Sequence, residues 1–325
     1  MGVTGSIPVV TTIRFFSVYF VLKYIFYLFI SLSIFLGTSF FQKSYVPDHS
    51  IFLERNEDLY ETIEMDGSFG KAVSFGIISY IPFIRDMINR GEYEIHYGET
   101  SISLIYRMIS GDTITRKITF PEGMTTKMIV QKLYETDSLR GDVKDIPDEG
   151  SLMPDTYFYK KGDSREDIIQ KMKNEMQNFI QKNLKNKTKK EIEKIMIIAS
   201  IIEKETSIDE ERALISSVYN NRLKINMRLQ SCPTVIYALS NGYGKIDHKL
   251  NKNDLFFKSP YNTYRNNGLP PSPICCPGRK SILASMKPSN TNFLYFVADP
   301  NTHHHSFSKD YEQHIKNKKQ SKENH

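Results

Sequence analysis

The stretch IIASIIEKET, residues 197–206, joins a run of apolar residues to two glutamates that are separated by one lysine. The apolar run begins at Ile195 and covers nearly all faces of a helix, which predicts a helix inside its domain rather than on its surface. Upstream, Thr188 followed three residues later by Glu191 forms a capping-box pattern and predicts where this helix begins. We therefore expect a buried helix whose charged end needs either ion-pair partners or a chemical function.

The two glutamates at the end of this helix, Glu203 and Glu205, point in different directions because a helix turns by about 100° per residue. Each continues an apolar line of the helix at spacings of three and four, so periodicity does not choose between them. A carboxyl group that is shielded from water has a raised pKa, and it can then act as a general acid near neutral pH. The alternative is that both carboxylates pair with Lys204, Arg212 or a neighbouring helix.

Length and composition place the chain among proteins with substantial cores. Its 325 residues suffice for two or three domains, and 40% of them are apolar. The net charge of +6 reflects lysines scattered along the chain, which indicates a solvated surface more than an anionic partner. The three cysteines have no CxxC spacing and predict no disulfide framework. The sequence contains neither a glycine-rich nucleotide-binding motif nor the GxSxG motif of serine hydrolases, so those classes have no support.

An uncharged apolar segment near the N-terminus predicts a membrane anchor. Residues 24–41 carry no charge, and residues 15–22 extend the segment across the single Lys23. A helix of this length spans roughly one bilayer core. We expect an anchor over residues 15–41, preceded by a short cytoplasmic segment, 1–14. A cleaved signal peptide and a buried core helix are the alternatives, and basic residues on both sides leave the orientation undecided by charge.

The rest of the sequence predicts an α+β protein, with a small module ahead of a larger, mostly helical domain that contains a small β-sheet. Strand–turn–helix patterns occur at 91–111 and 116–135, and they suggest that residues 42–149 form a juxtamembrane segment and a small α+β module. Helical patterns dominate residues 150–314. A polar tail follows at 315–325.

Two segments of the larger domain carry side chains that suit sugar binding. RLQSCPTVIYAL, residues 228–239, has a proline-marked turn that enters a helix, and SPYNTYRNNGLPPSP, residues 259–273, has a turn followed by glycine and prolines. Aromatic faces beside amides match the apolar faces and hydroxyl edges of sugar rings, although a well-packed surface loop is the alternative. The candidate substrate-binding residues of the two segments are Gln230, Thr234, Tyr261, Asn262 and Tyr264.

A run of three histidines, His303–His305, is the only pattern that suggests a metal. Its spacing does not match two zinc ligands four residues apart on a helix, and neither a neighbouring cysteine nor an HExxH motif accompanies it. We therefore expect neither a metal nor another cofactor, with a zinc-dependent peptidase as a weaker alternative.

Taken in their order along the chain, these motifs resemble the MltG (YceG-like) family of endolytic murein transglycosylases. The resemblance runs from about residue 97 to residue 314 and includes further motifs in the expected order. These are MPDTYFY at 153–159, NNRL at 220–223, YFVA at 295–298 and HSFS at 305–308.

The resemblance implies a single-pass protein of the cell inner membrane whose catalytic domain lies in the periplasm. It implies a LysM-like module within residues 42–149 and an endolytic transglycosylase domain over residues 150–314. The implied substrate is the glycan strands of peptidoglycan, and the implied partners are peptidoglycan synthases (penicillin-binding proteins), with no cofactor. The alternative function is an inactive murein-binding scaffold of the cell-wall synthesis machinery.

The resemblance also implies a reaction, which is cleavage of the MurNAc–GlcNAc β-1,4 bond inside nascent strands to leave a 1,6-anhydro end. Lytic transglycosylases with a lysozyme-like core carry their acid as Glu followed by Ser at the end of an apolar helix. On IIEKET this pattern places the acid at Glu205, before Thr206, and leaves Glu203 a supporting role. One carboxyl group suffices because the sugar's own C6 hydroxyl attacks in place of water.

The sequence departs from the family pattern at three places in its loops. Ser272 stands where the family usually has glycine, and Cys276 where it commonly has another residue. The usual single histidine before the S/T-F pair is replaced by the histidine run, of which His305 lines up. These differences bear on loop conformation and substrate fit more than on the reaction. The residues that the resemblance places in the cleft are Gln230, Tyr261, Asn262 and Tyr264.

Overall fold

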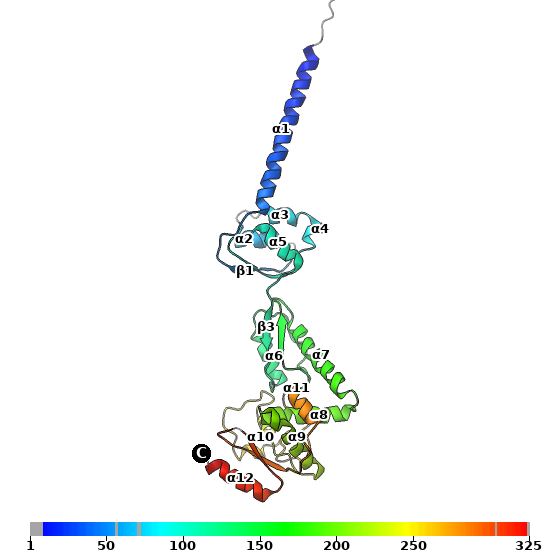
Figure 1. Cartoon of the computed structure of the whole chain (residues 1–325), viewed down its shortest axis with the longest axis vertical. Coiled ribbons are helices and arrows are strands. Elements are labelled where there is room, and N and C mark those ends of the chain that lie inside the picture. Colours follow the sequence, from blue (N-terminus) through cyan, green and yellow to red (C-terminus); the bar gives the residue numbers. More distant parts are fainter. Residues whose placement is uncertain (1–8, 56–57, 70–72, 303, 324–325) are drawn as a thin grey trace, which may run out of the picture. The chain divides into compact units, whose positions relative to one another are not determined.

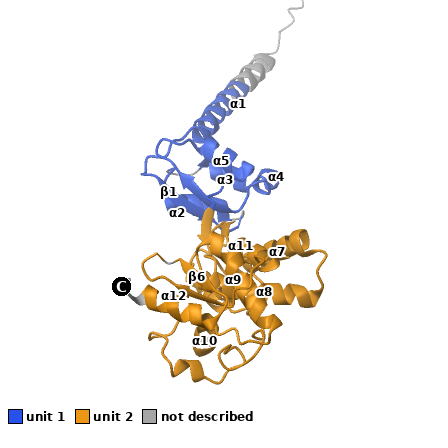
Figure 2. Ribbon diagram, turned by 60° about the horizontal axis from the view of Figure 1, so that its bottom comes forward, with its two compact units in different colours: residues 1–115 blue, residues 116–325 orange. Residues whose placement is uncertain are grey.

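The computed structural model describes residues 9–55, 58–69, 73–302 and 304–323 (Figure 1). The chain divides into two compact units, residues 1–115 and residues 116–325 (Figure 2).

The first helix, α1 (Val9–Phe40), contains the predicted anchor. Its segment Leu22–Phe40 is long and apolar enough to cross a membrane, with a mean hydropathy of 1.5. Nearly all of the apolar side chains of this segment are exposed, which agrees with a lipid-facing helix. The helix begins at Val9, within the segment predicted as a cytoplasmic N-terminus, and residues 1–8 of that segment lie outside the described residues.

Beyond α1, unit 1 is a small α+β layer around one core. Its antiparallel strands pair with Leu53 opposite Gly91, and its core centres on side chains such as Phe69, Tyr93 and Met108. The predicted strand–turn–helix at 91–111 is present. The elements are β1 (His49–Leu53), α2 (Leu59–Asp66), α3 (Val73–Ser79), α4 (Pro82–Arg85), β2 (Gly91–Ile95) and α5 (Ser101–Ser110).

Unit 2 is mostly helical and has two small antiparallel sheets, β3–β4 and β5–β6. This agrees with the predicted α+β class. Its elements are β3 (Arg116–Thr119), α6 (Thr126–Tyr134), β4 (Thr156–Tyr159), α7 (Arg165–Leu184), α8 (Lys189–Glu205), α9 (Asp209–Lys224), α10 (Cys232–Leu239), η2 (Asp254–Phe256), α11 (Arg279–Met286), β5 (Tyr295–Ala298), β6 (His305–Ser308) and α12 (Tyr311–Glu323).

The two strand–turn–helix patterns expected to share one module belong to different compact units. Among the described strands, β2 pairs with β1 and β3 pairs with β4, so the two patterns share no sheet. The boundary between units falls at 115/116, whereas the sequence-based division falls at 149/150. The patterns are alike locally, but each strand takes its partner from a distant part of the chain. A single LysM-like module built from both patterns is therefore not confirmed.

The predicted buried helix is α8, and its boundaries follow from local chemistry. The Thr188 hydroxyl accepts a hydrogen bond from the Glu191 amide, and the Glu191 carboxylate accepts one from the Thr188 amide, so the capping box is present. The interior from Ile195 to Ile202 is buried, and α8 packs against α9, α10 and α11. The chain turns extended at Thr206, which makes Glu205 the last residue of the helix.

Candidate active site

The carboxyl group of Glu205 is enclosed by three helices that converge at the end of α8. Its Oε1 accepts a hydrogen bond from the Tyr219 hydroxyl at 2.6 Å and another from the Ser231 hydroxyl at 2.6 Å. Tyr219 is a buried residue of α9, and Ser231 immediately precedes α10. Two neutral hydroxyl donors from distant parts of the sequence therefore bind one carboxyl oxygen, because α9 and the start of α10 both meet the end of α8.

Desolvation raises the pKa of Glu205 above the ordinary glutamate value of 4.5. The bonds from Ser231 and Tyr219 favour the charged form and oppose this shift, but burial outweighs them. The residue also borders a cavity of about 530 Å³ together with Glu203, Thr206 and other polar residues of unit 2. A carboxyl group that resists ionisation and borders a cavity has the properties of a general acid.

The charge of Arg222 also acts on this carboxyl group, after that of His305, but the hydrogen bonds of its guanidinium go to other groups. It lowers the pKa of Glu205 only weakly, as the least of the main contributions. Its guanidinium donates to the carbonyl of Leu294 at 2.6 Å and to that of Leu229 at 2.7 Å, and it lies over the ring of Tyr295. Desolvation lowers the pKa of Arg222 itself. Glu205 thus has hydroxyls rather than an ion pair as its direct partners.

Glu203 has the opposite surroundings. Its side chain and that of Arg212 are each only 6% exposed, and Oε1 lies 3.2 Å from the guanidinium. Its Oε2 accepts a hydrogen bond from the Gly278 amide at 2.9 Å, just before α11 begins. Arg212 also pairs with Asp209 at 3.2 Å. Glu203 therefore joins α8 to α9 and to the start of α11. This is the structural role, pairing with Arg212, that the sequence offered as the alternative to a chemical function.

Gln230 immediately precedes Ser231, one of the two hydroxyl donors to Glu205, and has an unusual backbone conformation. Its φ is +49°, in the left-handed region that residues other than glycine seldom adopt. Its amide donates to the carbonyl of Thr263, and its side chain is exposed. Gln230 is therefore next in the chain to a residue that contacts Glu205, although it does not line the cavity that Glu205 borders. Strained backbone of this kind is concentrated at functional sites.

Two of the predicted substrate-binding residues use their polar groups inside the protein. The buried hydroxyl of Thr234 donates to the Ser231 carbonyl at 2.7 Å and bonds the Thr263 hydroxyl. The buried amide of Asn262 donates to the carbonyls of Leu255 and Phe257 at 3.0 and 2.8 Å. These contacts fix the backbone around Ser231 and shape the loop that follows η2.

The two predicted tyrosines occupy different places. The Tyr261 hydroxyl bonds that of Ser272 at 2.7 Å, and its ring packs on Tyr237 with centroids 5.0 Å apart. The Tyr264 hydroxyl lies 3.1 Å from the sulfur of Cys232, the first residue of α10. Desolvation raises the pKa of Tyr264, and the charge of Glu205 contributes to the shift. Tyr264, Gln230 and Glu205 are thus gathered around the start of α10, while Tyr261 holds the neighbouring loop.

No sequence pattern indicates the two hydroxyl donors or a third contact, between Glu211 and His305. The Glu211 carboxylate accepts bonds from the His305 amide at 2.8 Å and from the Thr206 hydroxyl at 3.4 Å, and lies 2.6 Å from His305 Nδ1. Burial raises the pKa of Glu211, but the bonds from His305 and its neighbour outweigh it and lower the pKa. This contact connects the residue after the acid to β6.

The histidine run shows no metal-binding arrangement in the part of the chain that the structure describes. No group of three or more His, Cys, Asp or Glu side chains there could hold a metal ion. His304 and His305 both contact Glu211, whereas His303 lies outside the described residues.

The chain is similar to several known proteins. The model of the YceG-like family matches residues 54–320. A Bacillus subtilis protein named endolytic murein transglycosylase is 33% identical over 245 residues, which are 65% of this chain and 67% of that protein. A Streptococcus pneumoniae protein of the same name is 36% identical over 165 residues, which are 46% of this chain but only 28% of that protein.

A solved structure agrees with these sequence matches. It is a putative yceG-like protein, lmo1499, from Listeria monocytogenes, and it is 30% identical to this chain. The similarity covers 83% of this chain and 98% of the other, with a TM-score of 0.51.

Proposed function

The chain belongs to the YceG-like family, and on that premise we propose that it is an endolytic murein transglycosylase with Glu205 as its catalytic acid. The observation that carries the proposal is the desolvated carboxyl group of Glu205, held by two hydroxyls at the edge of a cavity. The names of the relatives from Bacillus subtilis and Streptococcus pneumoniae support the reaction class.

In the proposed reaction, Glu205 first donates its proton to the oxygen that links MurNAc to GlcNAc. The bond between that oxygen and C1 of MurNAc breaks, and the C6 hydroxyl of the same MurNAc attacks C1. The carboxylate of Glu205 then takes the proton from the attacking hydroxyl, which restores the acid. No water is consumed, so the product carries a 1,6-anhydro end and the second carboxylate of an ordinary glycosidase is not needed.

The geometry supports different roles for the two oxygens of Glu205, one as a hydrogen-bond acceptor and the other as the proton donor. Tyr219 and Ser231 both donate to Oε1. Among the described residues this leaves Oε2 to carry the proton toward the glycosidic oxygen. When the proton has left, the same two hydrogen bonds stabilise the carboxylate, so they make the acid easier to deprotonate at the moment of bond cleavage.

The remaining predicted residues fall into two groups within this proposal. Gln230 precedes the donor Ser231, and Tyr264 contacts Cys232 at the start of α10. Both would contact the glycan strand. Tyr261, Asn262 and Thr234 would position the two segments that carry those contacts. With α1 as the anchor, the catalytic domain would act in the periplasm on nascent strands and end their elongation near the peptidoglycan synthases that make them.

Digestion of purified murein by the full chain in detergent tests the proposal. We expect fragments whose masses are lower by one water than those of hydrolysed fragments, which is the signature of anhydro ends. Fragments with ordinary reducing ends would show hydrolysis instead and would contradict the mechanism. Intact murein would favour the alternative function, an inactive murein-binding scaffold.

A further inference from the structure

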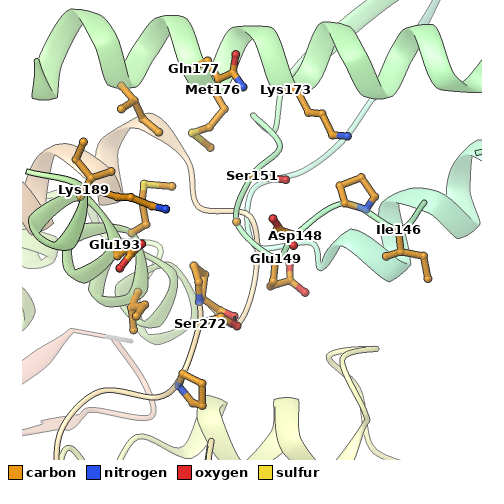
Figure 3. Close-up of a pocket in the computed structure, with 18 of the residues that line it drawn as sticks. Ile146, Asp148, Glu149, Ser151, Lys173, Met176, Gln177, Lys189, Glu193 and Ser272 are labelled. Atoms are coloured by element: carbon orange, nitrogen blue, oxygen red, sulfur yellow. Dashed lines mark hydrogen bonds between the residues drawn. The ribbon is translucent and has the colours of Figure 1, made fainter. Parts of the chain in front are cut away.

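A second cavity of about 990 Å³ lies in unit 2, away from the Glu205 carboxyl group (Figure 3). One wall is the loop 145–151, another is formed by facing sides of α7 and α8, and a third is the loop 271–273. The α8 residues that line it belong to the first half of the helix, whereas Glu205 ends the second half. None of the residues that the resemblance placed in the cleft lines this cavity.

The charged side chains around this cavity are of both signs and are not paired with one another. Figure 3 shows Lys189 and Glu193 of α8 on one side and Asp148 on the other, with Lys173 of α7 above them. Among the described residues, none of these four side chains has an ion pair or a hydrogen bond. Asp145 and Glu149 also line the cavity, so a purely anionic ligand would be opposed by four carboxylates and a purely cationic ligand by two lysines. A ligand with both carboxylate and ammonium groups matches the whole set.

The walls between these charges are apolar and contain one unsatisfied polar atom. Met176 and Ile180 of α7 face Ile192 and Met196 of α8. The hydroxyl oxygen of Ser151 is buried and has no hydrogen-bond partner among the described residues, and Ser151 lines the cavity. A buried polar atom without a partner is costly, so a ligand that supplies a hydrogen bond there would be stabilised. The combination of alkyl contacts, charges of both signs and an open hydroxyl suits a short peptide.

The position of the cavity connects it to the proposed reaction. Met196 and Glu205 lie nine residues apart on α8, which is about 13 Å at the usual helical rise. The loop 271–273 also connects the cavity to a predicted substrate-binding residue. Ser272 lines the cavity, and its hydroxyl bonds the hydroxyl of Tyr261. A branch attached to a sugar near Glu205 can therefore reach the cavity.

We propose that this cavity binds the short peptide that murein carries on its muramic acid residues. Acidic and diamino acids in such peptides supply the two signs of charge, and alanine side chains suit the apolar walls. The inference rests on the proposed function, because it takes murein as the substrate. Binding of the peptide in this cavity makes the enzyme selective for strands that still carry peptides.

The test compares cleavage of peptide-bearing strands with cleavage of the same strands after an amidase has removed their peptides. We expect the full chain to have a kcat/KM at least about tenfold higher on the peptide-bearing strands, the equivalent of one charged hydrogen bond. In Lys189→Glu this ratio should fall toward one. Lys190→Glu is the matched control, because Lys190 is an exposed neighbour in the same helical turn and does not line the cavity. An unchanged ratio in Lys189→Glu, or no preference in the unmodified chain, would overturn the proposal.

A binding measurement separates this proposal from the proposed function. Calorimetric titration of the full chain with the peptides that the amidase releases should show binding that Lys189→Glu weakens at least about fivefold and Lys190→Glu leaves unchanged. Binding without any cleavage of murein would support the peptide site and refute the transglycosylase. Cleavage without peptide binding and without substrate preference would refute the peptide site and support the transglycosylase.

Discussion

The surroundings of Glu203 and Glu205 differ more than their separation of two residues on one helix suggests. Glu203 forms an ion pair with a guanidinium and accepts a hydrogen bond from a backbone amide. Glu205 meets two neutral hydroxyls in a desolvated pocket, and its pKa rises. Burial alone therefore does not decide what a carboxyl group does. The charge of its partner decides whether it joins helices together or holds a proton for chemistry.

The largest expected effect is the loss of cleavage in Glu205→Gln. Glutamine keeps the shape and the acceptor oxygen of the side chain but cannot donate an acidic proton, so the rate should fall by at least about a hundredfold. Quantification of murein fragments by liquid chromatography measures it, and the circular dichroism spectrum should be unchanged. If Glu205→Gln cleaved at the unmodified rate while Glu203→Gln were inactive, the roles of the two glutamates would be reversed.

The next effect concerns the hydroxyl donors that distinguish the Glu205 pocket. Tyr219→Phe and Ser231→Ala each remove one hydrogen bond to the carboxylate, so kcat should fall by about tenfold to a hundredfold. The same change raises the pKa of Glu205 further, because the lost bond favoured the charged form. Activity declines as pH rises through this pKa, since the acid must be protonated. The alkaline limb of the pH–rate profile should therefore move to higher pH.

Tyr311→Phe is the matched control for the tyrosine, because its hydroxyl lies on an exposed side chain of α12. A reduced kcat with an unmoved alkaline limb in Tyr219→Phe would mean that the hydroxyl acts on the fold and not on the acid.

The smallest effect on catalysis, and a distinct effect on stability, is expected for Glu203→Gln. The change removes the charge that balances buried Arg212, although Asp209 still pairs with that guanidinium. We expect the free energy of unfolding to fall by about 1–3 kcal/mol, while cleavage by the folded protein changes only a few-fold. Urea unfolding of the full chain measures the loss, with Glu210→Gln as the control at an exposed position. A stability equal to that of the control would show that the ion pair contributes nothing.

The sequence predicted α8 well because the signals for that helix are local. The capping box at Thr188 and the apolar run to Ile202 lie within the helix itself. The choice between the two glutamates could not be made from periodicity, because it depends on partners from other elements. Tyr219 and Ser231 lie 14 and 26 residues away from Glu205 along the chain. Only the resemblance to a family directed attention to Glu205.

The sequence also could not predict which elements pair in the small module or which side chains face inward in the loops. The patterns at 91–111 and 116–135 look alike because each encodes a strand and a helix, but strand pairing with β1 and β4 places them in different units. In the segments 228–239 and 259–273, the sequence indicated polar and aromatic residues without showing which side chains face inward. The buried amide of Asn262 and the exposed side chain of Gln230 illustrate that difference.

The central claim is that desolvation keeps Glu205 protonated where an ordinary glutamate would be charged. Difference infrared spectroscopy between the unmodified full chain and Glu205→Gln, recorded across pH, isolates the carboxyl band of this one residue. We predict that the band of the protonated acid persists above pH 4.5, the ordinary glutamate value, and disappears over the same pH range in which cleavage declines. A band that is already lost at or below pH 4.5 would contradict the account.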